Sequence, residues 1–498
     1  MRINRRNILG AFTTTWALDT AWAAMADMAD MPSATSKRKT GLLPTTAWPT
    51  GAAWADLQKL ENHSTRAGVF QATLIAEPCA LPLITGRPAT GLWLYNQMLP
   101  GPLIEAAEGD RLEIEFVNRL PQATTVHWHG VPVPPSEDGS PWDLVAPGGR
   151  RTYQFALPPG SAGTYWFHPH PHAHAADQAA RGLAGCLVVR AKDDPLANIP
   201  ERHLVFSDLK LDENAAIADS DASDWMDGRE GQFVLVNGRR QPSLVFDAAG
   251  RERWRVWNAH NSRYLLLGIP GTGLTLVGTD GGLIDVPQPK LKSFLLAPGQ
   301  RAELVVDAGT RRDAAWLMAA PYARGKMASP ESAAVPLARI DFASVRAPVN
   351  ANPPLPSPLR KIPVLGPVQA TKRIVFSEAM QMNNGVHSMQ FLVNGRSFDS
   401  HRVDLHSKVN AVELWEIDNQ SDMDHPFHLH GTQFQLIDRL YQGKVEKLPY
   451  MAWQDTVNLR SGEKLRIRTV QRWRGLRMFH CHILEHEDAG MMGLLQVD

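Results

Sequence analysis

The sequence predicts an all-β protein built from three antiparallel β-sandwiches, and three observations support this prediction. First, a chain of 498 residues is too long for one hydrophobic core, since single cores stop growing near roughly 250 to 300 residues. Second, 37 prolines and 38 glycines interrupt the chain, and long segments with helical periodicity are hard to find. Third, one strand-like segment recurs three times, which indicates a repeated unit.

The recurring segment alternates apolar and polar residues, which is the period of a strand with one buried face. It is clearest at residues 111–118 and returns at 252–258 and 412–419. Further short strands are expected at residues 74–76, 91–95 and 124–129. Each copy also lies near a turn-forming dipeptide, which is Pro100-Gly101, Asn237-Gly238 or Asn394-Gly395.

The three copies and the composition between them divide the chain into domains of an ordinary size. A segment without sustained periodicity precedes the first sandwich, and a Pro-rich segment precedes the third. The expected parts are a signal peptide at 1–26, a linker or N-terminal arm at 27–66, sandwiches at 67–195, 196–345 and 371–498, and a Pro-rich linker at 346–370.

The N-terminus contains Arg5-Arg6 followed by a largely apolar, Ala-rich run to about Ala26. This pattern is typical of a twin-arginine signal peptide, with a cleavage site at 21–23 or 24–26. The alternative is a short membrane anchor, although the run is shorter than the roughly 20 residues that a span needs, and Asp19 weakens both interpretations. We expect a periplasmic or secreted protein, exported by the twin-arginine machinery, with no membrane span after signal removal.

The charge balance excludes several classes of partner. Lys and Arg total 51 and Asp and Glu total 51, so no global field favours nucleic acid, an anionic membrane or a strongly charged substrate. We expect a monomer that binds no nucleic acid.

Three cysteines are an odd number for an oxidising compartment, so at least one of them does not pair within the chain. Cys79 and Cys186 can form one disulfide or remain buried thiols, and the sequence leaves both alternatives open. Cys481 lies among histidines and has another possible role, as a metal ligand.

Ten of the 18 histidines fall in four clusters, two in the first repeat and two in the third. Each cluster contains a pair of the form His-x-His, and on a strand residues i and i+2 point to the same face. Four such pairs can deliver eight imidazoles into one cavity, which suits three copper ions. One pair alone is usually a half-buried strand feature, but four pairs make that alternative very weak. The clusters are His127-Trp128-His129-Gly130, His168-Pro169-His170, the segment from His425 through His428 and His430 to Gly431, and the segment from His480 through Cys481, His482 and His486 to Met491.

Cys481 faces away from His480 and His482 if the three residues lie on a strand, so one strand can serve two metal sites. Together with His425, His486 and Met491, its thiolate completes a set of two imidazoles, one thiolate and a weak thioether, which is the ligand set of a blue-copper electron-transfer site. Zinc is the alternative metal, but structural zinc sites normally use four closed ligands without an adjacent ring of imidazoles.

These motifs, in this order, closely resemble the multicopper oxidases, and especially the bacterial three-domain cuprous oxidases and laccases. The resemblance covers about residues 70–498 and extends to the segments 163–168, 181–185 and 430–434. It implies three cupredoxin-like Greek-key domains and four copper ions, one of type 1, one of type 2 and two of type 3. It also implies electron transfer from a reducing substrate to dioxygen, which is reduced to water. By motif, the type 1 ligands are His425, Cys481, His486 and Met491; the type 2 ligands are His127 and His428; and the type 3 ligands are His129, His168, His170, His430, His480 and His482.

Reduction of dioxygen to water consumes four protons, so acids or water chains near the cluster are required. Asp138 and Glu487 resemble acids that the family uses for proton delivery. The alternative is that each is a turn residue or a hydrogen-bond acceptor that orients a ligand histidine.

The electron donor is the least determined feature. Asp422, Met423, Met380 and Met382 can form a soft cuprous-ion site over the type 1 copper, but the long Met-rich insertion of the cuprous oxidases is missing and such methionines often pack in cores. Cu(I) oxidation and oxidation of phenols or aromatic amines therefore both remain open. Two non-oxidase alternatives are a non-catalytic scaffold protein and a copper-storing protein.

Overall fold

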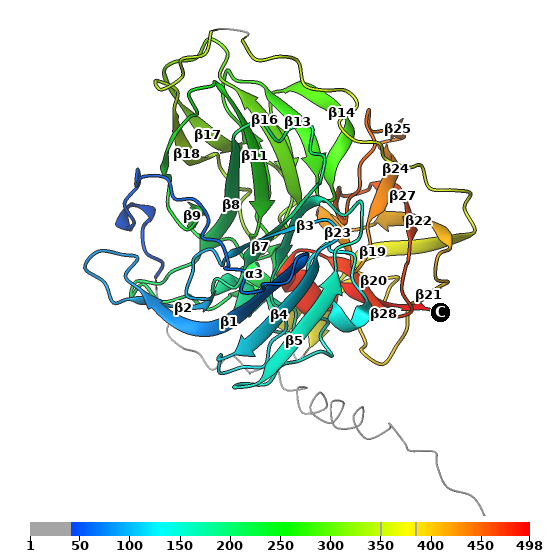
Figure 1. The fold of residues 1–498 in the computed structure, drawn as a ribbon. Coiled ribbons are helices and arrows are strands. Elements are labelled where there is room, and N and C mark those ends of the chain that lie inside the picture. Colours follow the sequence, from blue (N-terminus) through cyan, green and yellow to red (C-terminus); the bar gives the residue numbers. More distant parts are fainter. Residues whose placement is uncertain (1–40, 349–350, 384–385) are drawn as a thin grey trace, which may run out of the picture. The chain divides into compact units, whose positions relative to one another are not determined.

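Each third of the described chain places its strands in two β-sheets (Figure 1). The computed structural model describes residues 41–348, 351–383 and 386–498, without the side chains of 382–388. The predicted signal peptide at 1–26 and residues 27–40 of the predicted arm lie outside the described residues.

The first sandwich has a four-stranded sheet in the order β2-β1-β4-β5 and a three-stranded sheet in the order β3-β7-β6. Its core includes the buried rings of Phe116, Trp128 and Tyr153. The strands are β1 (Val69–Leu81), β2 (Thr90–Tyr95), β3 (Leu103–Ala107), β4 (Arg111–Asn118), β5 (Arg150–Ala156), β6 (Gly163–Phe167) and β7 (Gly185–Arg190).

The second sandwich has a six-stranded sheet in the order β14-β13-β16-β11-β8-β9 and a five-stranded sheet in the order β10-β18-β17-β12-β15. Trp254 and Phe246 are buried in its core. The strands are β8 (Glu201–Leu209), β9 (Phe233–Val236), β10 (Ser243–Val245), β11 (Arg251–Asn258), β12 (Leu265–Gly268), β13 (Leu274–Thr279), β14 (Gly282–Leu291), β15 (Phe294–Leu296), β16 (Arg301–Asp307), β17 (Ala314–Ala320) and β18 (Val335–Asp341).

The third sandwich has a six-stranded sheet in the order β20-β19-β22-β27-β24-β25 and a five-stranded sheet in the order β21-β29-β28-β23-β26. Trp415, Phe427 and Phe479 lie in its core. The strands are β19 (Ala370–Asn383), β20 (Val386–Val393), β21 (Leu405–Ser407), β22 (Val412–Asn419), β23 (His425–Leu429), β24 (Phe434–Tyr441), β25 (Lys444–Glu446), β26 (Thr456–Leu459), β27 (Lys464–Val470), β28 (Gly475–Cys481) and β29 (Met492–Val497).

The helices in the described ranges are short. They are α2 (Ala175–Ala180), α3 (Ala222–Asp227) and α4 (Leu484–Asp488), with the 3-10 turns η1 (Thr45–Ala47) and η2 (Pro135–Glu137). None of the described helices has the length and apolarity needed to span a bilayer. The Asp488 carboxylate accepts hydrogen bonds from the backbone N–H groups of Ala175 (3.3 Å) and Ala176 (2.9 Å), which fixes α4 of the third sandwich against α2 of the first.

The predicted threefold repeat is confirmed. The strands β4, β11 and β22, which contain the recurring segment, each pair in parallel with the first strand of their sandwich, which is β1, β8 or β19. Each ends at an asparagine, Asn118, Asn258 or Asn419, whose Oδ1 accepts a hydrogen bond from the backbone N–H two residues later, at 2.9, 3.2 and 3.0 Å. The predicted all-β fold of three sandwiches follows from this repeated architecture.

One strand prediction is wrong, and one turn lies beside the dipeptide that the sequence offers. In the first copy the hairpin turn is Asn96-Gln97, with φ of 51° and 60°, and Pro100-Gly101 lies just after it. Residues 124–129 form only isolated bridges, Thr124 with Val145 and His127 with His168, and no regular strand.

Residues 42–66 of the predicted arm lie along the first two sandwiches in an extended form. Backbone N–H groups of Leu43, Trp54 and Leu60 donate to the carbonyls of Leu211 (3.1 Å), Ser243 (2.9 Å) and Leu103 (2.8 Å). Leu43 and Trp48 are buried, so the described part of this arm is packed against the sandwiches.

Residues 351–369 contain no strand and connect the second sandwich to the third. Arg360 donates to the carbonyl of Gly281 at 2.7 Å, and Gln435 donates to the carbonyl of Pro363 at 2.6 Å, so this linker is held on both sides.

Cys79, Cys186 and Cys481 are all free thiols, so Cys79 and Cys186 do not form a disulfide.

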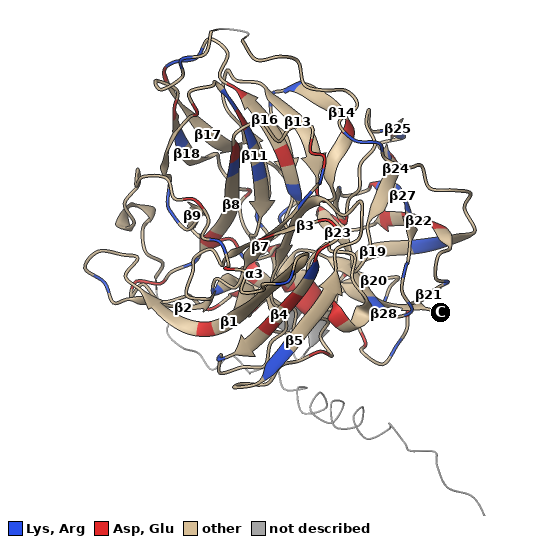
Figure 2. Cartoon of the chain, in the orientation of Figure 1, with Lys and Arg blue, Asp and Glu red and all other residues tan. Residues whose placement is uncertain are grey.

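Acidic and basic residues are interspersed over the strands of all three sandwiches (Figure 2), as expected from the balanced charge.

Candidate metal centre

Adjacent strands of the third sandwich supply the ligands predicted in its two histidine clusters. β23 carries His425 and His428, and β28 ends with His480 and Cys481. The two strands pair antiparallel with His428 opposite His480. The register therefore brings two clusters that are about fifty residues apart in the chain to one end of the sheet.

The first sandwich supplies the other two clusters from loops. His127 and His168 exchange backbone hydrogen bonds at 2.9 and 3.2 Å, although neither belongs to a strand. The ring of Trp128 is buried in the core of this sandwich, and its neighbours His127 and His129 have fully buried rings on the side of the third sandwich.

The shortest nitrogen–nitrogen distances divide the eight predicted imidazoles into one pair and two trios. The Nε2 atoms of His127 and His428 are 3.4 Å apart. In one trio, His129 Nδ1 lies 3.4 Å from His168 Nε2 and 3.2 Å from His482 Nε2. In the other trio, His480 Nε2 lies 3.4 Å from His170 Nε2 and 2.9 Å from His430 Nε2. The pair and both trios combine histidines from the first sandwich with histidines from the third.

This geometry fits metal ions. Three sets of imidazoles have nitrogens that all lie within 4.8 Å of one another and could hold a metal ion: His127, His428 and His430; His127, His129 and His168; and His170, His430 and His480. All eight rings are fully buried. Burial, and then the neighbouring imidazoles, hold the pKa of seven of them below the usual range: His129, His168, His170, His428, His430, His480 (to about 3) and His482. Neutral imidazoles with converging lone pairs are a donor set for cations.

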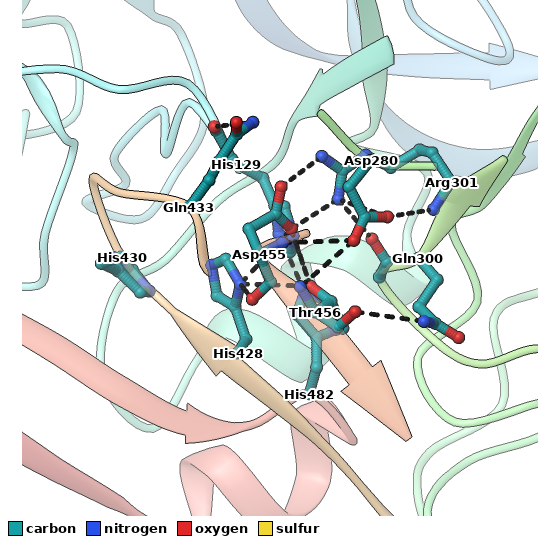
Figure 3. A network of polar contacts seen from close by, with 12 residues as sticks. His129, Asp280, Gln300, Arg301, His428, His430, Gln433, Asp455, Thr456 and His482 are labelled. Carbon is teal, nitrogen blue, oxygen red and sulfur yellow. Dashed lines mark hydrogen bonds and ion pairs between the residues drawn. The ribbon is translucent and has the colours of Figure 1, made fainter. Parts of the chain in front are cut away.

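Hydrogen bonds on the outer nitrogens select which nitrogen faces inward. His430 Nδ1 donates to Asp138 Oδ2 (2.9 Å), and His428 Nδ1 donates to the carbonyl of Asp455 (2.9 Å), so both rings present Nε2. His129 is the reverse case, because its Nε2 donates to Asp455 Oδ1 (3.0 Å) and its Nδ1 therefore faces the trio (Figure 3). The protein thus fixes the tautomers of these three rings.

Cys481 belongs to a separate group with two further histidines. Its Sγ lies 3.3 Å from His425 Nδ1 and 3.9 Å from His486 Nδ1, and these two nitrogens are 3.3 Å apart. Met491 is fully buried, and its backbone bonds to both His486 (2.8 Å) and Cys481 (3.0 Å). Burial raises the pKa of the Cys481 thiol, so a thiolate here requires a bound cation.

The outer nitrogens of this second group have different environments. His486 Nε2 donates to the carbonyl of Met226 in α3 (3.1 Å), and its ring stacks on Phe391 with centroids 3.9 Å apart. His425 Nε2 instead lies 2.8 Å from Ser421 Oγ and 3.2 Å from Glu378 Oε1. Of these two predicted ligands, His425 is therefore the one with a carboxylate beside its outer nitrogen.

The two predicted acids both lie against ligand histidines. Asp138 receives the hydrogen bond from His430, and its backbone carbonyl accepts from His127 Nδ1 (2.8 Å). Glu487 lies with Oε1 3.4 Å from His170 Nδ1 and Oε2 3.2 Å from His480 Nδ1. Burial, then the neighbouring acids of α4, raise the pKa of Glu487 well above the usual value, which favours its protonated form.

The structure does not gather the predicted cuprous-ion residues into one site. Met423 is fully buried and its Sδ accepts a hydrogen bond from Arg324 Nη1 at 2.8 Å, so its thioether is neither reachable from solvent nor free to bind a cation. Asp422 and Met380 are exposed, Met380 to 67%. The side chain of Met382 lies outside the described residues.

Sequence reasoning missed four residues that contact predicted ligands, Glu378, Ser421, Asp455 and Thr456, and also Arg301, which contacts Asp455. All five lie outside the histidine motifs, and only Ser421, four residues before His425, is close to one in sequence. An isolated acid or arginine on a strand carries no pattern that marks it, so only tertiary packing reveals these contacts.

Comparisons with known proteins identify the family. Three family models, each described as multicopper oxidase, match residues 83–194, 206–336 and 375–498. The chain belongs to the multicopper oxidases. Among curated relatives, the multicopper oxidase mco of Staphylococcus aureus is 32% identical over 81% of this chain and 83% of the relative. The laccase of Bacillus subtilis (strain 168) is 27% identical over 88% and 96%.

Solved structures of multicopper oxidases share the fold. A structure described as a multicopper oxidase from Campylobacter jejuni, a metallo-oxidase, has a TM-score of 0.87 and 43% identity, covering 93% of this chain and 98% of that one. A laccase from Pediococcus acidilactici has a TM-score of 0.78 and 28% identity, covering 93% and 96%. This multicopper oxidase is therefore a copper-dependent oxidoreductase of the cupredoxin-like fold, with oxygen as electron acceptor.

Proposed function

We propose that this multicopper oxidase couples one-electron oxidation of its donor at a type 1 copper to four-electron reduction of dioxygen to water at a three-copper cluster. The single observation that carries the proposal is the convergence of eight buried imidazoles, whose shortest nitrogen–nitrogen distances form a pair and two trios, beside a separate Cys-His-His group. Bound copper would supply one-electron redox chemistry at one centre and oxygen binding and reduction at the other.

The proposed ligands follow that grouping. His425, Cys481, His486 and Met491 would hold the type 1 ion, and His127 with His428 the type 2 ion. The trio of His129, His168 and His482 and the trio of His170, His430 and His480 would each hold one type 3 ion.

The backbone around Cys481 connects the two centres. One peptide links Cys481 to His480, in one trio, and another links it to His482, in the other. A covalent path of a few bonds therefore runs from the thiolate to each trio, and it explains why ligands of the two centres alternate on adjacent residues.

Glu487 and Asp138 are the proposed acids at the cluster. Glu487 lies within 3.4 Å of two proposed ligand imidazoles and its pKa is raised, which favours a protonated carboxyl and suits proton delivery to reduced oxygen. Asp138 orients His430 through its side chain and His127 through its carbonyl, and we propose that it also takes part in proton delivery.

A metal ion is the donor class that the surroundings of His425 support best. One face of β19 runs from Ile374 and Phe376 in the core through Glu378 to exposed Met380, because residues i and i+2 share a face. Met389 lies opposite Met380 in the hairpin. A thioether followed by a carboxylate at the edge of a type 1 ligand suits a soft cation such as Cu(I), and the relative from Campylobacter jejuni is described as a metallo-oxidase.

Phenols and aromatic amines are the second donor class, since two of the relatives above are laccases. Steady-state kinetics of the copper-loaded protein with Cu(I), Fe(II) and a dimethoxyphenol would separate the classes. The proposal expects kcat/KM for Cu(I) to exceed that for the phenol, and the reverse order would assign the protein to phenol oxidation.

Replacing Glu378 by glutamine tests the metal-donor route. We expect kcat/KM for Cu(I) to fall about tenfold to a hundredfold, since a hydrogen bond to a charged group contributes about 1.5–3 kcal/mol. The phenol value should change by less than about threefold, because an uncharged donor does not need the carboxylate. Glu446→Gln on exposed β25 is the matched control. Equal losses with both donors would show that Glu378 acts on the type 1 centre itself and would remove the metal-donor role.

Copper removal should make stability strongly dependent on pH. The folded copper-free protein has histidines with lowered pKa values, whereas histidines of the unfolded chain titrate near 6.5. Below about pH 6.5 the unfolded state therefore binds more protons, and each such histidine costs up to about 1.4 kcal/mol of stability per pH unit until its folded-state pKa is reached. Between about pH 7.5 and about pH 5.5 we expect Tm of the copper-free protein to fall by about 10 °C or more.

The copper-loaded protein is the comparison for this titration, because metal ligation keeps the imidazoles unprotonated. Differential scanning calorimetry of both forms checks the prediction. Parallel Tm curves for the two forms would mean that the buried histidines are not the copper ligands.

The proposed location is periplasmic or secreted, after export by the twin-arginine machinery, with a role in handling copper. Changing Arg5-Arg6 to Lys-Lys and fractionating cells tests the export route, and continued export through the same machinery would contradict it.

Two measurements separate the oxidase from the non-oxidase alternatives. A non-catalytic scaffold would show no intense blue band, and a copper-storing protein would bind copper without consuming oxygen.

A further inference from the structure

The middle sandwich supplies none of the twelve proposed copper ligands. One of its arginines, however, contacts Asp455, which hydrogen-bonds to two of those ligands. Arg301, the first residue of β16, has a fully buried side chain. Its guanidinium makes a two-point contact with Asp455 of the third sandwich, from Nη1 to Oδ1 at 2.7 Å and from Nη2 to Oδ2 at 2.6 Å (Figure 3). Its Nε donates to the carbonyl of Thr164 in the first sandwich at 2.8 Å. This one side chain therefore joins all three sandwiches.

The remaining polar groups around the pair are satisfied and hold it in one place. Asp280 accepts the backbone N–H of Arg301 at 2.8 Å through Oδ1, and through Oδ2 it accepts the backbone N–H groups of Asp455 (3.2 Å) and Thr456 (3.3 Å). Asp280 thus holds the backbones of both residues, while the guanidinium and the carboxylate hold each other.

The fixed carboxylate determines how one ligand ring is presented. Asp455 Oδ1 accepts the hydrogen bond of His129 Nε2 at 3.0 Å, and the hydroxyl of Thr456 lies at 3.0 Å from the same nitrogen. Meanwhile the carbonyl of Asp455 accepts from His428 Nδ1. The rings of His129 and His428 stack with centroids 3.8 Å apart, yet they present opposite nitrogens. Residue 455 enforces this difference.

A glycine in the first histidine motif gives independent support for the importance of this pair. Gly130 has φ of +81°, and a Cβ there would lie 2.1 Å from Asp455 Oδ2 and 2.5 Å from Arg301 Nη2. The residue that follows His129 can therefore have no side chain while the pair occupies its position. The pair is packed directly against the backbone of the ligand motif.

We infer that Arg301 is a positioning residue for the three-copper cluster: it holds Asp455 so that His129 presents Nδ1 to its metal. The inference rests on the proposed function, because it assumes that His129 is a copper ligand. It adds a role for the middle sandwich, which would complete the cluster without supplying a ligand.

The test is a double-mutant cycle on copper retention. Arg301→Met leaves the buried carboxylate of Asp455 without its counterion, and we expect copper of the cluster to be lost to a Cu(II) chelator about 10-fold to 100-fold more readily, as for other partners of metal-bound histidines. Asp455→Asn keeps an oxygen that accepts from His129. Arg301→Met with Asp455→Asn should therefore retain cluster copper better than Arg301→Met alone, because no unpaired charge remains. Arg301→Lys should be intermediate, since lysine cannot make the two-point contact.

The readouts are copper per chain, the electron paramagnetic resonance signal of the type 2 ion and the absorption of the type 3 pair, with the blue band as an internal reference. The control is Arg253→Met, because Arg253 is also buried in the middle sandwich and pairs with Glu303 (2.9 Å) and Asp194 (2.6 Å). Loss of cluster signals with the blue band intact, absent from the control, supports the inference.

Two results would overturn it. Arg301→Met with unchanged cluster copper and spectra would show that Asp455 keeps its position unaided. Loss of the blue band and cluster signals together, with a fall in Tm like that of Arg253→Met, would show a general structural role. Copper analysis of the unmutated protein distinguishes this failure from failure of the proposed function. If the unmutated protein holds no cluster copper, both the inference and the proposed function are wrong.

Discussion

Cys481→Ser is expected to abolish the intense blue absorption and to lower turnover by about a thousandfold or more, equal to about 4 kcal/mol of activation free energy. The thiolate is the only soft anionic ligand of the proposed type 1 site and begins the shortest covalent path to His480 and His482. Serine preserves the shape of the side chain but provides neither property. Visible spectra and oxygen uptake measure the effect.

The eight imidazoles of the cluster are separate from the Cys481 group, so Cys481→Ser should still hold cluster copper. Copper analysis and the type 2 resonance signal provide this control. A serine variant that stays blue would mean that Cys481 is not the type 1 ligand.

Glu487→Gln is expected to lower kcat for oxygen reduction about 10²-fold to 10⁴-fold, the usual contribution of a positioned proton donor. Glutamine keeps the size of the side chain and its place beside His170 and His480, but it cannot supply a proton. The blue band should be unchanged at rest. During turnover it should remain bleached, because electrons reach the type 1 centre faster than oxygen accepts them.

Glu485→Gln is a matched control on the same short helix. Glu485 is also fully buried, but its carboxylate accepts from Asn261 at 2.7 Å and lies away from the ligand imidazoles. Turnover near that of the unmodified protein in Glu487→Gln with a full copper load would reduce Glu487 to an orienting partner of the histidines.

Local patterns in the sequence were sufficient to predict the fold and the set of residues that converge. Period-two segments ending in asparagine identified β4, β11 and β22, because a half-buried strand imposes alternation wherever it occurs. The His-x-His pairs predicted one shared cavity, and the structure brings all eight rings together.

The sequence could not reveal features that depend on packing between distant segments. Asp455 hydrogen-bonds to His129 from another sandwich, and Arg301, 154 residues away in the chain, contacts Asp455 from the middle one. The sequence left open whether Met423 lines a cuprous-ion site or packs in a core, and in the structure it packs inward against Arg324. Spacing along the chain does not determine the direction of a side chain in an irregular loop.

Residue spacing also could not divide the histidines into a pair and two trios. The motifs alternate between metal groups, so that His428 and His430, on one short segment, belong to different sets. Only the inter-sandwich distances separate them.

The most direct measurement of the central claim is the ratio of donor oxidised to dioxygen consumed by the fully copper-loaded protein, with hydrogen peroxide assayed in the same vessel. Two sandwiches that jointly hold three coppers should deliver four one-electron oxidations per dioxygen and release water without peroxide. A ratio of two with matching hydrogen peroxide, or no oxygen uptake by protein that carries four coppers, would contradict it.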